Sequence, residues 1–300
     1  MKNRIHMNPI LKKELMVGSR SIKMSFAIMG INAFLTLIVV LVIISTNAMG
    51  GVMSYDYSSL SSLFPILGCT ECGLISLIVP IITSGSISGE RERQTLDIML
   101  TTPVSPLYIA FGKLGSAMMV VMMYMITSIP VMAIAFVLGG MSWFALFGLI
   151  AMLLYLGIYV GSVGIFCSSV VKKSVMATIL TIAIGVGIIV VTSVIFYAGL
   201  AIKAYQANLP GSAAPSFSPG AVPLVMMLNP YSPIFDFMLR AMSSASIYDI
   251  IKETGNISIT LGNLYKYWIP VSIICNLLIS FGFLKLAARN IAVTRNRKRK

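Results

Sequence analysis

The chain has 300 residues, of which 57% are hydrophobic and only 10% are charged. Soluble domains carry about 25% charged residues, so most of this surface cannot face water, and a soluble globular protein is excluded. A net charge of +13 would indicate nucleic-acid binding in a soluble protein, but here its distribution indicates membrane orientation instead. The sequence therefore predicts an all-α integral membrane protein that does not bind nucleic acid.

Six apolar segments are long enough to cross a bilayer, which takes about 20 helical residues. The predicted spans are residues 24–46, 68–88, 116–138, 143–168, 174–199 and 267–288. The first apolar run is too long for a cleaved signal peptide, so we expect an uncleaved first span. Because no polar segment is large enough to fold independently, residues 1–300 are predicted to form a single transmembrane domain.

Lys and Arg are distributed unevenly between the two predicted faces of the membrane. All but four of the 22 lie in the N-terminal tail, the 89–115 loop, the 169–173 turn or the C-terminal end. The positive-inside rule then places both termini in the cytoplasm, which requires an even number of spans. An aromatic belt at the outer interface is predicted to contain Trp143, Tyr197, Tyr265, Tyr267 and Trp268.

Two segments outside the spans combine apolar side chains with charged residues or prolines. Residues 1–23 combine apolar and basic side chains, which favours a short interfacial helix, with an unstructured basic tail as the alternative. The external loop, residues 200–266, contains an apolar stretch at 221–242. Its prolines, with Asp236 and Arg240, argue against a seventh span, so we expect a re-entrant or interfacial element there.

The spans contain little that could perform chemistry. Glu71 is the acidic residue nearest to a span interior, and we interpret it as a boundary charge or as a group facing an external vestibule. Without a midplane ionisable group an ion-coupled carrier is disfavoured, although Asn32 and Asn276 keep that alternative open. The Cys69–Cys72 pair lacks the partners of a metal site, so we expect no metal, and the sequence leaves a disulfide between them open.

Small residues recur along one face of the fourth span. Gly157, Gly161, Gly164 and Ser168 follow the helical repeat and allow another helix backbone to approach closely. We predict that these four residues form a helix-packing seam.

A dense charge cluster follows the second span. We predict a short helix that begins near Ser88, with Glu90 and Glu92 in its first turn, and that ends before a rigid turn at Pro103. Such an element could transmit force from a cytoplasmic partner, and the alternative is an ordinary interfacial loop. The candidate docking residues are Glu90, Arg91, Glu92, Arg93, Gln94, Thr95, Leu96 and Pro103.

These residues carry a family resemblance. The run from Gly89 to Leu96, with Leu100-Thr-Thr-Pro103, Gly112-Lys-Leu114 and Leu228-Asn-Pro-Tyr-Ser-Pro233, resembles the permease subunits of type-2 ATP-binding-cassette (ABC) exporters over nearly the whole chain. Many family members have Gly where this chain has Gln94, which puts a flexible turn at that position in doubt.

The resemblance implies that the segment around Glu90 is the coupling element that contacts an ATPase. It also implies a second permease subunit, identical or different, and alternating access to the exterior. The chain has no phosphate-binding loop of its own, so ATP and Mg²⁺ are expected on a separate subunit, and no catalysis or cofactor on this chain. The expected location is the plasma membrane of a prokaryotic cell, in contact with lipid. An ion-coupled secondary transporter or channel and a non-transporting membrane anchor are the alternatives.

Overall fold

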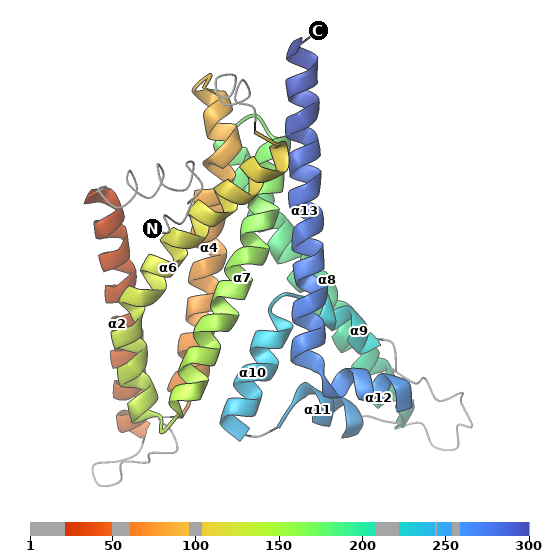
Figure 1. Cartoon of the computed structure of the whole chain (residues 1–300). Helices are drawn as coiled ribbons and strands as arrows, with labels where there is room; N and C mark the ends of the chain where they lie inside the picture. The colour runs from red at the N-terminus through yellow and green to blue at the C-terminus, as the bar shows by residue number, and fades with distance from the viewer. Residues whose placement is uncertain are drawn as a thin grey trace, which may run out of the picture. The chain divides into compact units, whose positions relative to one another are not determined.

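The computed structural model describes residues 22–49, 61–95, 104–207, 222–243, 245–253 and 259–299, and every regular element in these ranges is a helix (Figure 1). The helices are α2 (Ile22–Met49), α4 (Leu63–Glu92), α6 (Pro106–Leu138), α7 (Trp143–Val170), α8 (Ser174–Ala207), α9 (Val222–Met227), α10 (Ser232–Ser243), α11 (Ile247–Glu253), α12 (Ile259–Lys266) and α13 (Trp268–Arg299).

Six of the described helices are long and apolar enough to cross a membrane, namely α2, α4, α6, α7, α8 and α13. The predicted all-α fold with six spans is therefore confirmed. Helices α4 and α6 extend well beyond their predicted spans toward the loop that joins them. The expected N-terminal interfacial helix over 1–23 lies almost entirely outside the described residues.

The chain divides into two compact units. Unit 1 contains α2, α4, α6 and α7, the start of α8 as far as Ile182 and the end of α13 from Ser280. Unit 2 contains the remainder of α8 and α13 and the short helices α9 to α12. The prediction that residues 1–300 form a single transmembrane domain stays a prediction.

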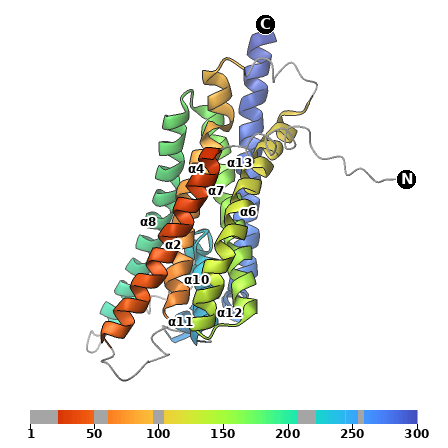
Figure 2. The same ribbon diagram turned by 90° about the vertical axis from the view of Figure 1, so that its left-hand side faces the viewer.

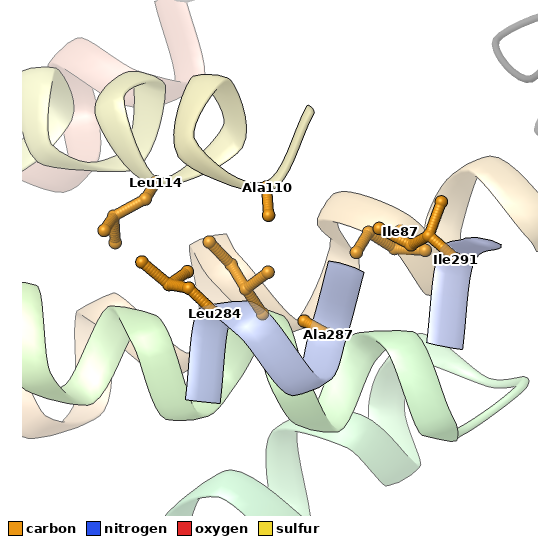
Figure 3. Close-up of a cluster of buried hydrophobic side chains, with 7 residues drawn as sticks. Ile87, Ala110, Leu114, Leu284, Ala287 and Ile291 are labelled. Carbon is orange, nitrogen blue, oxygen red and sulfur yellow. The ribbon is translucent and has the colours of Figure 1, made fainter. Parts of the chain in front are cut away.

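In unit 1, helix α4 packs along α7 and α6, and α2 lies against α4 and α6 (Figure 2). The end of α13 joins this bundle through a cluster of buried apolar side chains. Figure 3 shows Ala110 and Leu114 of α6 pointing toward Leu284 and Ala287 of α13, with Ile87 of α4 beside Ile291. Because these side chains are aliphatic and closely packed, the cluster holds the ends of α4, α6 and α13 together.

In unit 2, the predicted re-entrant segment is broken into α9 and α10 rather than forming a single helix. The turn between them contains Pro230, whose missing N–H and fixed φ favour a break. The Ser272 hydroxyl and the Asn276 amide nitrogen, both on α13, donate to the Met227 carbonyl oxygen, at 2.8 and 3.0 Å. The Asn229 amide donates to Thr192 of α8 at 2.9 Å, so this turn is fixed to two long helices.

The predicted aromatic belt stays a prediction for three of its residues and is wrong for the other two. Trp143, Tyr197 and Tyr267 are exposed, as a lipid-interface position requires. Trp268 and Tyr265 are instead fully buried, with ring centroids 5.9 Å apart, in the core that α9 and α11 form with them. Burial also raises the pKa of Tyr265 to about 12. The sequence pattern was misleading here because the short helices cover these two rings.

Candidate functional site

The charged end of unit 1 is where α4 ends, α6 begins, α7 ends and α8 begins. The prediction of a new helix beginning near Ser88 is wrong, because α4 continues without interruption through Glu92. Glu90 and Glu92 therefore lie in the last turn of α4, where the helix dipole disfavours negative charge. Their negative charges therefore need positive partners or hydrogen-bond donors, and residues of neighbouring helices provide them.

Glu90 connects α4 to α6. Its Oε1 lies 3.5 Å from Nζ of Lys113, whose side chain is only 8% exposed. The Thr95 hydroxyl donates to the other carboxylate oxygen of Glu90. A nearly buried lysine needs a counter-charge, so this pair fixes the first turns of α6 against the end of α4.

Arg91 connects α4 to the end of α7. Its guanidinium donates to the carbonyl oxygens of Ser169 and Val171, both at 3.3 Å. The last carbonyl groups of a helix have no intrahelical donor, and the helix dipole places partial negative charge on them. Arg91 thus satisfies the end of α7 both as a hydrogen-bond donor and as a cation.

Glu92 connects α4 to the start of α8. The backbone N–H of Ser174 donates to its Oε1 and the Ser174 hydroxyl donates to its Oε2, both at 2.9 Å. A carboxylate at a helix N-terminus satisfies a free N–H and complements the positive end of the dipole. Arg91 and Glu92, adjacent in sequence, therefore bind helix ends of opposite polarity.

Gln94 closes α4 in a left-handed conformation, with φ of 59°. The Thr95 N–H donates to the Glu90 carbonyl oxygen at 2.9 Å, and the Gln94 N–H donates to that of Arg91 at 3.2 Å. These two bonds define a Schellman motif, in which the left-handed position is usually Gly. Gln94 therefore occupies a position that favours Gly, with its side chain accepted at an energetic cost.

The structure brings most of the predicted docking residues together at the charged end, and their docking role stays a prediction. Glu90, Arg91 and Glu92 hold the ends of α6, α7 and α8, while the side chains of Arg93 and Gln94 are exposed. Leu96 and Pro103 lie outside the described residues. The charge cluster is thus a junction of four helices with an exposed edge.

The predicted packing seam on α7 faces α4 and α6. A Cβ atom added to Gly164 would lie 2.0 Å from Oγ1 of Thr83, and one added to Gly161 would lie 2.7 Å from Cδ1 of Leu114. Ser168, at the end of the seam, accepts hydrogen bonds from the Ile87 and Ser88 backbone N–H groups of α4, both at 2.9 Å. The small residues thus permit close backbone approach, as the spacing indicates.

A cluster of hydroxyl side chains continues from this seam and was not predicted. Ser84 and Thr178 share a short hydrogen bond between α4 and α8, and the Ser88 hydroxyl donates to Ser174 at 3.3 Å. Asn290 of α13 also donates to the Ser169 hydroxyl at 3.1 Å. Ser and Thr residues stand near the ends of these apolar spans in the sequence, but that placement does not by itself pair them.

Glu71 is not a boundary charge. Its side chain is fully buried in the bundle, and the Tyr124 hydroxyl of α6 donates to its Oε2. All four cysteines are free thiols, with Cys72 and Cys167 buried and Cys69 exposed. Within the described ranges, no group of three or more His, Cys, Asp or Glu side chains is arranged to hold a metal ion.

The chain matches a known protein family over most of its length. Residues 35–281 match the family described as ABC-2 family transporter protein. No curated protein matches the chain. The matched region begins within α2 and ends within α13, so it includes both the charged end and the packing seam.

Proposed function

Since the chain belongs to the ABC-2 transporter family and is a multi-pass membrane component of an ABC transporter, we propose that it is the permease of an exporter. A separate ATP-hydrolysing subunit, which binds ATP and Mg²⁺, drives it. Both termini and the charged end face the cytoplasm of a prokaryotic cell, consistent with the excess of Lys and Arg in these segments.

The observation that carries this proposal is the junction at the charged end. Arg91 and Glu92 bind the ends of α7 and α8, and Glu90 binds Lys113 at the start of α6. A force applied to residues 93–105 would therefore reach four helices together rather than α4 alone. An ATPase that closes on ATP could use such a junction to move the permease.

The close packing of α4 on α7 supports the same mechanism. Gly164 leaves no room between the two helices, and the Ser168 hydroxyl accepts a hydrogen bond from the α4 backbone. We infer that α4 and α7 move as one body when the charged end is displaced. The translocation path then opens toward the exterior at the contact with a second permease subunit, which is either a copy of this chain or a related chain.

The exposed apolar faces of α2 and α8 are consistent with contacts to lipid or to that second subunit. Both helices carry large apolar side chains that are more than half exposed, among them Phe26 and Leu37 on α2 and Val190 and Val194 on α8. Contiguous apolar surface of this kind is covered in the functional protein, by lipid or by another chain.

The test is co-purification of an ATPase subunit from native membranes in mild detergent, followed by mass spectrometry and an ATPase assay. Charge reversal of Glu90 or Glu92 would also break the helix junction, so Arg93→Glu is the sharper variant because the Arg93 side chain is exposed. Lys266→Glu, also on an exposed lysine but in α12, is the matched control.

We expect an ATP-binding subunit in stoichiometric amount with the wild type and with Lys266→Glu, and a clear loss with Arg93→Glu. Equal recovery from both variants would contradict docking at the charged end. A chain that purifies without any ATPase and transports cargo in an ion gradient would contradict the proposal as a whole.

A further inference from the structure

Glu71 is a buried carboxyl group that the proposed coupling mechanism does not use. It lies in α4 about two turns after the helix begins at Leu63, at the end of the helix remote from Glu90 and Glu92. Its side chain is 0% exposed, between apolar neighbours that include Leu67 and Ile75 on the same helix. Such a position in a span is costly for a charge and usually has a function.

One side chain stabilises this carboxyl group by a hydrogen bond. The Tyr124 hydroxyl donates to Oε2, whereas Oε1 has no hydrogen-bond partner among the described residues. Ser128, one turn further along α6, also interacts with the carboxyl group, and its hydroxyl donates to the Met125 carbonyl oxygen at 3.0 Å.

Glu71 also lacks a counter-charge, unlike Asp236 and Glu90. Asp236, also 0% exposed, accepts from Nε of Arg240 at 2.8 Å, and Glu90 pairs with Lys113. In the described part of the chain no Lys or Arg side chain pairs with Glu71. A buried carboxylate with one donor and no cation is strongly disfavoured relative to its neutral form.

We propose that Glu71 is a proton-binding site, occupied by a proton when α4 and α6 are packed as in this structure. The carboxylate takes one proton from water and becomes a neutral carboxylic acid. In that state a single unsatisfied neutral oxygen is buried in place of an uncompensated charge. The hydrogen bond with Tyr124 then joins two neutral groups, with either oxygen able to donate.

The surroundings contain few groups that could compete for this proton. Tyr124 on α6 and Cys72 on α4 interact with Glu71. The titratable side chains of α7 are Tyr155, Tyr159 and Cys167, and α2 carries only Lys23, in its first turn.

The site is connected to α2 by a chain of hydrogen bonds. Asn32 of α2 donates to the Thr127 hydroxyl at 3.2 Å, and Thr127 donates to the Tyr124 carbonyl oxygen at 2.7 Å. Any movement that separates α4 from α6 and admits water would stabilise the ionised form and release the proton. Proton binding and the closed packing of α2, α4 and α6 are therefore linked.

The experiment is infrared absorption spectroscopy on the purified full-length protein in lipid nanodiscs, which detects the C=O stretch of a protonated carboxyl group. Spectra are recorded at neutral pH in potassium and in sodium buffer. The variants are Glu71→Gln, Tyr124→Phe and, as the control at a paired buried carboxylate, Asp236→Asn. Glu71→Gln has the shape of the neutral acid, and Tyr124→Phe removes only the hydroxyl.

We expect a protonated-carboxyl band in the wild type at neutral pH, absent from Glu71→Gln, shifted in frequency in Tyr124→Phe and unchanged in Asp236→Asn. The absence of the band from the wild type would overturn the proposal, because Glu71 would then be ionised. Loss of the band when sodium replaces potassium would also overturn it, by assigning the site to a metal cation. If Glu71→Gln fails to fold, an unshifted band in Tyr124→Phe would overturn it.

Discussion

The carboxylate of Glu92, the last residue of α4, caps the first turn of α8 by accepting both the N–H and the hydroxyl hydrogen bonds of Ser174, each at 2.9 Å. This contact joins two residues that are 82 positions apart in sequence, and it has a direct consequence for stability. Removal of the cap in Glu92→Ala leaves the Ser174 N–H without its acceptor.

We expect Glu92→Ala to lower the melting temperature of the purified protein by a small but measurable amount, because the group is at the surface. Glu92→Gln, which keeps an acceptor oxygen, should retain most of the stability. Arg93→Ala is the neighbouring control and should leave the melting temperature nearly unchanged. An equal loss in Glu92→Ala and Arg93→Ala would show that the cap contributes nothing specific.

The packing seam predicts a graded series of Gly→Ala effects. The added Cβ would lie 2.0 Å from Thr83 at Gly164, 2.7 Å from Leu114 at Gly161 and 3.4 Å from Met118 at Gly157. Overpacking of this kind costs about 1–3 kcal/mol, so the loss of stability should be largest for Gly164→Ala and smallest for Gly157→Ala. Gly73→Ala, where the new methyl group meets nothing within 4 Å, is the control. Thermal unfolding in detergent measures the order, and a different order would contradict the packing described here.

Gln94 predicts a stabilising substitution. A non-Gly residue in the left-handed region costs about 1 kcal/mol, so Gln94→Gly should stabilise the Schellman motif by roughly 0.5–1 kcal/mol. Gln94→Val should destabilise it, because a β-branched residue disfavours positive φ. Arg93→Gly, at a residue whose φ is −81°, should lower the stability of the protein instead. Equilibrium unfolding of the three variants tests this, and a destabilised Gln94→Gly would refute the assigned turn.

Breaking the Asp236–Arg240 ion pair, which lies outside the spans, should cause a large loss of stability. Asp236 is fully buried, and it also accepts from the Ile247 N–H at 2.7 Å, which fixes α10 to the start of α11. Removal of the cation in Arg240→Ala should cost about 3 kcal/mol, because it leaves a buried charge unpaired. Asp236→Asn combined with Arg240→Ala should recover part of that loss. A double-mutant cycle with additive effects would show that the pair is not coupled.

The capping carboxylate of Asp249 predicts that the stability of unit 2 depends on pH. The Ser246 N–H and hydroxyl donate to its carboxylate at 2.8 and 2.7 Å, and these bonds hold the pKa of Asp249 below its usual range. A depressed folded-state pKa gives stability that is present above the unfolded-state pKa and is lost as pH falls through the folded value. We therefore expect part of the acid-induced loss of stability to be absent from Asp249→Asn, as measured by melting temperature against pH.

The control for the pH series is Lys252→Gln, at an exposed residue of the same helix, α11. Its acid dependence should match that of the wild type. Identical pH profiles for the wild type and Asp249→Asn would show that the capping carboxylate does not contribute.

Several features followed from the sequence alone because they are local properties of the chain. The length and apolarity of six segments determined six helices, and the spacing of Gly157, Gly161 and Gly164 determined which face of α7 packs closely. Tight packing and bilayer crossing depend on composition and on helical periodicity. Both are visible in the sequence without knowledge of which helices become neighbours.

Other features were decided only by the tertiary structure, because they depend on which helices become neighbours. The sequence shows Arg91 and Glu92 side by side, but only the arrangement of helices places the end of α7 beside one and the start of α8 beside the other. Glu71 and Trp268 stand near predicted span ends, where exposure is expected, yet both are buried. Glu71 is bound by Tyr124 of α6, and Trp268 is covered by the short helices of unit 2. Burial and charge compensation are properties of contacts between distant segments, so no local pattern determines them.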